Sequence, residues 1–164
     1  MEMILQEVDR AVRAQLFYLA VAMALTLPDI CSALGSPNGE TEGRKYRNWY
    51  NANLAARYPN ITADDMWSLR NGVLHQGRCG HPNMQYSRIL FTLPEPQGNR
   101  VHNCIVNDAL NLDAIQFCRD VVDSVRVWFA ANQNGKNVVV NLPNLVQYRP
   151  KGLAPYIVGM PLIA

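Results

Sequence analysis

Apolar residues recur at intervals of three and four over four stretches of the chain, which is the spacing of one buried face on an α-helix. We expect these helices at residues 3–27, 40–57 and 62–76, and from the cap residue Asn111 or Asp113 to Gly135. The second half of the first stretch is apolar on every side, which predicts that it lies in the centre of the core. Pro28 follows it, and we expect a kink or an end of the helix there.

The third stretch carries signals for both of its ends. Thr62 and Asp65 have the spacing of a capping box, in which two side chains satisfy the free N–H groups of the first turn. Gly77 is a residue typical of the position just after a helix, so we expect this helix to end near His75 or Gln76.

A different pattern separates the third and fourth helices. Residues 87–93 and 101–106 are rich in β-branched and apolar residues, and the turn-forming residues 94–99 lie between them. They predict two short strands paired as an antiparallel β-hairpin at about residues 86–107. The fold class that follows is mainly α, a helical bundle with a small β-hairpin inserted before the last core helix.

The end of the chain is harder to assign from the pattern. Residues 138–140 predict a third short strand, and four prolines after residue 142 argue against further helix. We therefore divide a single domain into a helical bundle at 1–135 and a Pro-rich C-terminal extension at 136–164. The apolar end of this extension needs a partner surface, either the bundle itself or a second subunit.

Length and composition suit one folded domain, since the chain has 164 residues of which 49% are hydrophobic. The formal net charge of +2 neither indicates nor excludes a nucleic-acid partner. The apolar run from Leu16 to Leu27 is too short to span a membrane, and acidic residues precede it, unlike in a signal peptide. We expect a buried core helix and a cytoplasmic protein without a membrane partner; a secreted form is the alternative.

Arg70, Asn71 and His75 are the main candidates for chemistry, because a guanidinium and an imidazole together suit phosphate chemistry. Residues five apart differ by about 140° on an α-helix, so Arg70 and His75 cannot share a face of one straight helix. Convergence needs a frayed helix end or a site between two subunits. The plainer alternative pairs Arg70 with a carboxylate such as Asp29 or Asp65 and uses His75 to cap its own helix.

The hexapeptide Arg70-Asn71-Gly72-Val73-Leu74-His75 resembles the R-N-x3-H motif of the HEPN superfamily. That resemblance implies an up-down four-helix bundle and a homodimer, and it implies RNA binding or a metal-independent endoribonuclease without a cofactor. It implies that His75 is the general base toward a ribose 2′-hydroxyl, that Arg70 steadies the scissile phosphate, and that Asn71 orients one of them. Other HEPN proteins are non-catalytic, so a dimeric interaction or regulatory module is the alternative.

Three runs of the chain together are similar to a group of small uncharacterised bacterial proteins, a likeness that implies a fold and a cytoplasmic origin but no activity. These runs cover residues 27–34, 43–49 and 68–77. For binding of an RNA backbone we expect contributions from Arg78, Arg44 and Lys45, the last two on a basic helix face that solvation alone would also explain.

Scattered cysteines in such a chain are most simply buried free thiols. Cysteine and histidine residues near the expected hairpin allow two further kinds of site. A zinc site would use Cys79, His81, His102 and Cys104, although their spacing is unusual for structural zinc. A nucleophilic site would use Cys79 or Cys104 with a histidine as base.

Overall fold

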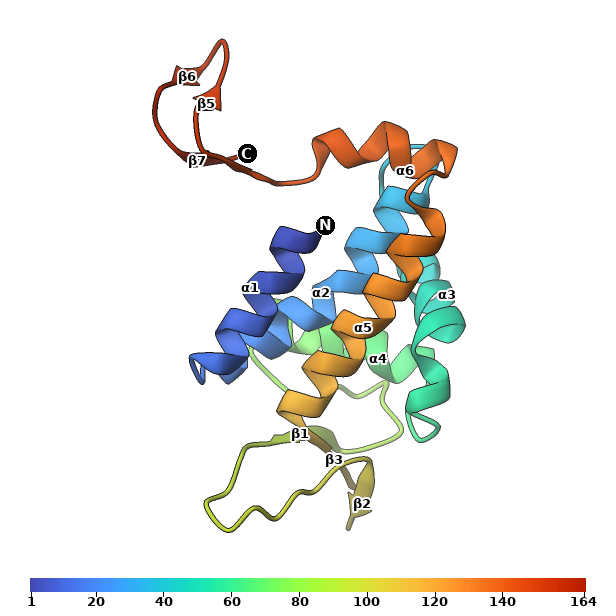
Figure 1. Cartoon of the computed structure of the whole chain (residues 1–164). Coiled ribbons are helices and arrows are strands. Elements are labelled where there is room, and N and C mark those ends of the chain that lie inside the picture. Colours follow the sequence, from blue (N-terminus) through green and yellow to red (C-terminus); the bar gives the residue numbers. More distant parts are fainter.

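The structure is a computed structural model that describes residues 1–164, and it is mainly α-helical (Figure 1). The α-helices are α1 (Glu2–Arg13), α2 (Phe17–Gly35), α3 (Gly43–Asn53), α4 (Ala63–Asn71), α5 (Ala114–Asn132) and α6 (Lys136–Asn141). The strands are β1 (Arg88–Thr92), β2 (Cys104–Val106), β3 (Ala109–Asp113), β4 (Tyr148–Arg149), β5 (Gly152–Leu153), β6 (Ile157–Val158) and β7 (Leu162–Ile163). Short 3-10 turns follow α3 at Ala55–Arg57 and α6 at Leu142–Asn144.

Helix α2 lies at the centre of the molecule and contacts α1, α3, α5 and α6 (Figure 1). Its length and composition would allow it to cross a membrane, but 56% of the relevant window is buried inside the protein. The expected core position is confirmed from Ala20 onward, whereas Tyr18 and Leu19 at the start of the helix are exposed. The helix is longer than the apolar run because it continues through Pro28 to Gly35.

The expectation of one helix at residues 3–27 was wrong, because the chain turns back between α1 and α2. Gln15 takes a positive φ of 59°, and the Leu16 N–H bonds to the carbonyl of Ala11. This elbow lets α2 run back alongside α1, so that both apolar faces reach the same core (Figure 1). Nothing in the local periodicity marks the break, since the apolar spacing continues through it.

The antiparallel hairpin expected at 86–107 was also wrong in its pairing. Strand β3, which the sequence pattern missed, lies in the middle of a three-stranded sheet of order β1-β3-β2. It pairs in parallel with β1 and in antiparallel fashion with β2, so the hairpin is β2–β3, closed by Asn107 and Asp108. Every residue of β3 is buried, the polar Asn111 and Asp113 included. The strand was missed because Asn111 and Asp113 were interpreted as cap residues of the following helix, and Asp113 does cap α5.

The short strand expected at residues 138–140 is instead part of helix α6. Val138 is buried, and the Asn141 side-chain amide donates to the carbonyls of Ala33, Leu34 and Ser36 at the end of α2. The carbonyls at the end of a helix lack the N–H partner four residues on, so Asn141 adds hydrogen bonds to the end of α2 and docks α6 on it. This tertiary role is invisible in the local sequence.

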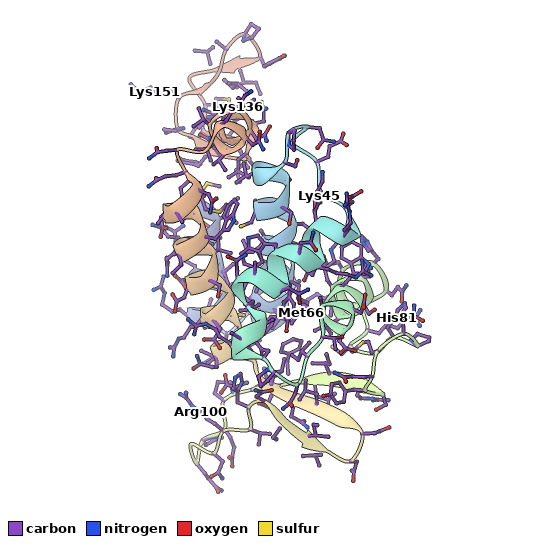
Figure 2. The ribbon with its side chains drawn as sticks, turned by 90° about the vertical axis from the view of Figure 1, so that its right-hand side faces the viewer. Lys45, Met66, His81, Arg100, Lys136 and Lys151 are labelled. Carbon is purple, nitrogen blue, oxygen red and sulfur yellow. The ribbon has the colours of Figure 1, made fainter.

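Residues 147–164 form two small two-stranded pairings, β4–β7 and β5–β6, and extend away from the helices (Figure 1). The apolar end of the chain therefore does not pack back on the bundle, and side chains such as Tyr156 and Val158 are exposed. Figure 2 shows Lys151 of this extension beyond Lys136, at the opposite end of the molecule from Arg100 in the β1–β2 connection.

Buried β3 and exposed β2 provide a test of the sheet order, because Leu110 and Ile105 are directly paired. Leu110 is fully buried, whereas Ile105 is 51% exposed. We expect Leu110→Ala to lower the free energy of unfolding by about 2–5 kcal/mol, the usual cost of a core cavity. Ile105→Ala should change it by less than about 0.5 kcal/mol. Urea denaturation of both variants checks this, and equal losses would contradict the central position of β3.

Candidate functional site

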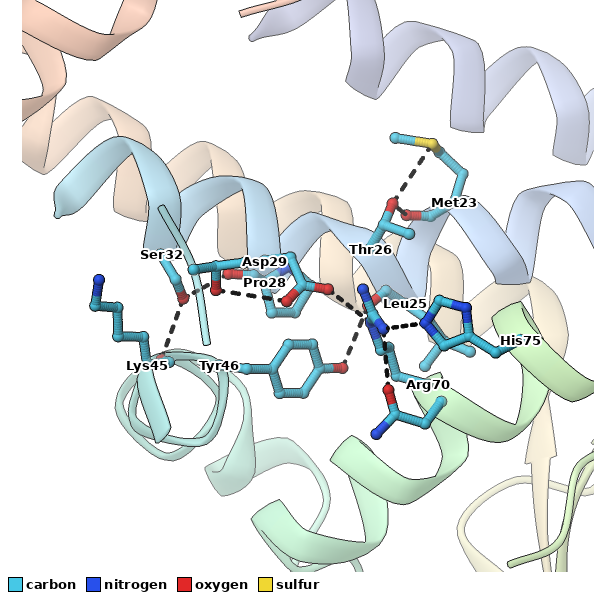
Figure 3. A network of polar contacts seen from close by, with 12 residues as sticks. Met23, Leu25, Thr26, Pro28, Asp29, Ser32, Lys45, Tyr46, Arg70 and His75 are labelled. Carbon is cyan, nitrogen blue, oxygen red and sulfur yellow. Dashed lines mark hydrogen bonds and ion pairs between the residues drawn. The ribbon is translucent and has the colours of Figure 1, made fainter. Parts of the chain in front are cut away.

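The C-terminal end of α4 widens into a π-helical turn at Gly72–Gln76. In a π-helix the backbone hydrogen bond joins residues five apart, so each turn holds an extra residue. The Gly72 carbonyl accepts from the N–H of Gly77, and also from the N–H of Arg78 at 3.0 Å. This widening reduces the angular offset between residues five apart, and it brings His75 back over Arg70 (Figure 3).

The end signals of this helix were predicted correctly. Thr62 and Asp65 form a capping box with both reciprocal bonds present, and Gly77 ends the turn with a left-handed φ of 63°. Arg70 and His75 were expected to converge either at a frayed helix end or between two subunits, and the distorted end of this helix provides the convergence. They meet within one chain, and the distance from Arg70 Nη1 to His75 Nε2 is 2.8 Å.

Gly72 makes the π turn possible because the following loop passes directly over it. A Cβ atom at this position would lie 2.6 Å from the backbone carbonyl oxygen of Arg78 and 3.6 Å from that of Gly80. A glycine inside a helix costs about 1 kcal/mol relative to alanine, and this close approach is the physical reason for accepting that cost. The sequence places Gly72 inside the motif but does not reveal what lies against it.

Arg70 is held on the other side by a buried carboxylate from α2. Its Nε donates to Asp29 Oδ2 at 2.8 Å, and the two side chains are only 17% and 9% exposed. Burial raises the pKa of Asp29, an effect that the neighbouring Arg70 guanidinium partly opposes. The ion pair considered from sequence is thus present with Asp29. Asp65 instead binds Thr62 and Gln85.

The remaining nitrogens of Arg70 are used unequally. Nη1 donates to Asn71 Oδ1 at 2.9 Å and also contacts His75 Nε2 (Figure 3). Nη2 has no hydrogen-bond partner within the chain, and it is not among the buried polar atoms that lack partners. The Nη2 end of the guanidinium is therefore open to an acceptor from outside the chain.

The Arg70–His75 contact defines the state of the imidazole ring. A guanidinium can only donate, so Nε2 must be the acceptor and cannot carry a proton. The ring is then neutral in this arrangement, with its proton on Nδ1. His75 does not cap a backbone carbonyl with its side chain, which was the role considered in the plainer alternative.

Trp67 is a site residue that the sequence analysis missed. The Arg70 guanidinium carbon lies 5.2 Å from the centre of the Trp67 ring, within the range of a cation–π interaction. Arg47 lies 5.4 Å from the same ring and is also paired with Asp64 at 2.6 Å. The spacing of Trp67 and Arg70, three residues apart on one helix, was the available signal.

The three basic residues expected to bind an RNA backbone lie in different places. Arg44 pairs with Glu42, and the Lys45 amine bonds to Asn38 and to the carbonyl of Glu40. Figure 3 shows the Lys45 side chain directed away from Arg70. Arg78 lies three residues after His75, is exposed on the loop that follows the π turn, and forms no ion pair in the chain.

The alternative zinc site considered at Cys79, His81, His102 and Cys104 is not formed, because no three His, Cys, Asp or Glu side chains lie together as a metal site requires. His102 instead accepts from the Asp113 N–H, and His81 accepts from the Asn83 N–H. Such a site would have required the expected pairing of residues 87–93 with 101–106, and the fold pairs β2 with β3 instead.

The four cysteines are free thiols, as expected, and two of them, Cys31 and Cys118, are buried. Burial raises the pKa of Cys118 to about 12, and burial also raises the pKa of Cys79. An activated nucleophile needs a lowered pKa, so Cys79 lacks the electrostatic environment of a catalytic thiolate.

An apolar cavity of about 520 Å³ lies beside the π turn, at the elbow between α1 and α2. Its lining includes Leu16, Leu19 and Met23, and Leu74 of the π turn. Tyr18 is 62% exposed and its hydroxyl donates to the carbonyl of Val73 at 3.2 Å. An exposed apolar surface therefore continues directly into the segment that carries His75.

No protein-family model matches the chain, and no curated protein or solved structure matches it either.

The role of Gly72 can be tested with a matched pair of helical glycines. We expect Gly72→Ala to lower the free energy of unfolding by about 1–3 kcal/mol, because the new methyl group meets the Arg78 carbonyl. Gly35→Ala should leave stability unchanged or raise it by up to about 1 kcal/mol, since its Cβ would make an ordinary 3.5 Å contact with Trp128. Thermal and urea unfolding measure both, and a Gly72→Ala protein as stable as Gly35→Ala would refute the close approach.

Proposed function

We propose that this protein is a HEPN-like RNA-binding protein with metal-independent endoribonuclease activity. The observation that carries the proposal is the 2.8 Å contact between Arg70 Nη1 and His75 Nε2, which joins an anion-binding group to a proton acceptor. The resemblance of Arg70–His75 to the R-N-x3-H motif gives this pair its roles. In this proposal α2, α3, α4 with its π turn, and α5 are the four core helices of the HEPN-like bundle.

His75 is the general base in the proposed reaction. The substrate 2′-hydroxyl replaces Arg70 at His75 Nε2 and gives its proton to that nitrogen. The bond from the 2′-oxygen to phosphorus forms, and the bond from phosphorus to the 5′-oxygen breaks. The 5′-oxygen takes a proton from water, and the products are a 2′,3′-cyclic phosphate and a 5′-hydroxyl. This balance requires no metal and no cofactor.

Arg70 stabilises the charge that grows on the phosphate during this step. Its Nη2 has no partner in the chain and is free to donate to a phosphate oxygen, and Nη1 becomes free once the 2′-hydroxyl occupies His75. Asn71 bonds to Nη1 and so orients Arg70, one of the two roles that the motif implies. Asp29 and Trp67 hold the guanidinium in place before substrate arrives.

A homodimer in the cytoplasm, where RNA is available, is part of the same proposal. Convergence of Arg70 and His75 within one chain removes the geometric argument for a dimer. Its support is now the exposed apolar surface at Leu16, Tyr18 and Leu19, which adjoins the π turn. A second subunit bound there would place two copies of the motif near one another.

A non-catalytic dimeric interaction or regulatory module is the second candidate, and one observation favours it. The Arg70–Asp29 ion pair is largely enclosed by the chain, which is what a purely structural arginine would show. In that case the same apolar surface serves binding alone, and His75 has no chemical role.

Cleavage of a mixed single-stranded RNA pool in the presence of EDTA tests the proposed activity. We expect the wild-type protein to produce fragments ending in 2′,3′-cyclic phosphate, detected by mass spectrometry. His75→Ala should lower the rate at least about 100-fold, because general base catalysis commonly contributes that much. Arg70→Ala should lower it similarly.

Gln76→Ala is the matched control, since Gln76 is exposed on the same π turn and makes no side-chain hydrogen bond. It should cleave RNA at the wild-type rate. If the wild-type protein and His75→Ala cleave RNA at equal rates, the proposed endoribonuclease is rejected. The same holds if neither protein cleaves RNA, and the interaction module then remains.

A further inference from the structure

A second cavity, polar and of about 490 Å³, lies at the loop that packs on Gly72. The loop from Gly77 to Ser87 and the turn between β2 and β3 line it. Arg78 and Gly80 of this loop are the residues whose carbonyls approach Gly72. The cavity therefore shares its wall with the turn that carries His75, and its volume lies within the usual range for small-molecule sites.

The loop that forms this cavity is fixed by hydrogen bonds to the rest of the fold. The Gln85 backbone N–H and side-chain amide both bond to the buried Asp65, at 2.8 Å and 2.7 Å. The Tyr86 hydroxyl donates to the carbonyl of Asn60 at 2.6 Å, and the Ser87 N–H donates to the carbonyl of Asp108 at 3.1 Å. The cavity is thus a preformed feature, held by a buried carboxylate.

Two exposed residues of opposite charge, Arg78 and Asp108, are among those that line the cavity, and they are not paired with each other. The guanidinium of Arg78 and the carboxylate of Asp108 form no ion pair and no side-chain hydrogen bond in the chain. His81 adds an imidazole whose Nδ1 accepts from the Asn83 N–H, which leaves Nε2 for a ligand. Figure 2 shows His81 at the outer edge of the molecule, on the loop beside α4.

A ligand for this cavity needs hydrogen-bond donors for the carboxylate and negative charge or acceptors for the guanidinium. A carboxylate accepts two parallel N–H groups. Among the RNA bases, guanine presents two neighbouring donors, N1–H and the N2 amino group, on one edge. Adenine and cytosine each present one donor group beside an acceptor, and uracil presents one donor between two acceptors. An RNA phosphate supplies the negative charge for Arg78.

We propose that this cavity binds a guanine nucleotide, with Asp108 accepting from N1–H and N2–H of the base and Arg78 binding a phosphate. The inference rests on the proposed function only in taking RNA as the source of the nucleotide. Arg78 and Gly80 line the cavity and pack on Gly72, so a guanosine bound here would be held by the loop that adjoins the turn carrying His75. Asp108 then determines base preference.

Titration of the full chain with GMP, AMP and inorganic phosphate, followed by calorimetry, tests the cavity without any cleavage assay. We expect GMP to bind at least about 10-fold more tightly than AMP, a difference of about 1.4 kcal/mol. Asp108→Asn should weaken GMP binding about 10-fold and leave AMP unchanged. Arg78→Gln should weaken GMP and phosphate together. Glu95→Gln, which changes an exposed carboxylate of the β1–β2 connection, is the matched control and should bind as the wild type does.

Equal affinity for GMP and AMP, no binding of GMP, or no effect of Asp108→Asn would each overturn the guanine site. These outcomes differ from failure of the proposed function. RNA cleavage that depends on His75 but shows no preference for guanosine sustains the nuclease and rejects the cavity. Selective GMP binding that Asp108→Asn abolishes, in a protein that cuts no RNA, sustains the cavity and rejects the nuclease.

Discussion

The carbonyl group of Arg78 passes so close to the α-carbon of Gly72 that no side chain fits between them. That approach allows the Gly72 carbonyl to accept from both Gly77 and Arg78, and so holds α4 open as a π turn. An α-helical continuation would have turned His75 away from Arg70 by about 140°. The candidate chemistry of the molecule, the neutral state of His75 and the wall of the polar cavity all depend on this one contact.

Arg70 illustrates how one buried ion pair suits two different functions. Asp29 and Trp67 immobilise its guanidinium, which preorganises a phosphate-binding group but would equally stabilise a structural arginine. The other two nitrogens of the guanidinium distinguish a phosphate-binding arginine from a structural one, since Nη2 remains unpaired and Nη1 contacts His75. An arginine that only forms the ion pair with Asp29 would not require the contact between Nη1 and the His75 imidazole.

The sequence predicted what local chemistry determines and failed where distant contacts decide. The capping box at Thr62 and the end of the helix at Gly77 were correct because both signals act within a few residues. Strand β3 was missed because it ends at Asp113, the cap of α5, so its polar residues were interpreted as the start of that helix. The π turn was missed because its cause is the loop packed against Gly72, and α6 was missed because Asn141 acts on the end of α2.

The protonation pattern of the His75 ring tests the central claim, that Arg70 and His75 meet within a single chain. Nitrogen-15 NMR of the imidazole distinguishes a protonated from an unprotonated ring nitrogen. At a pH where the ring is neutral, the structure predicts a proton on Nδ1 and none on Nε2, because Arg70 can only donate. Arg70→Gln should change these ring signals. A proton on Nε2, or ring signals that Arg70→Gln leaves unchanged, would contradict this account.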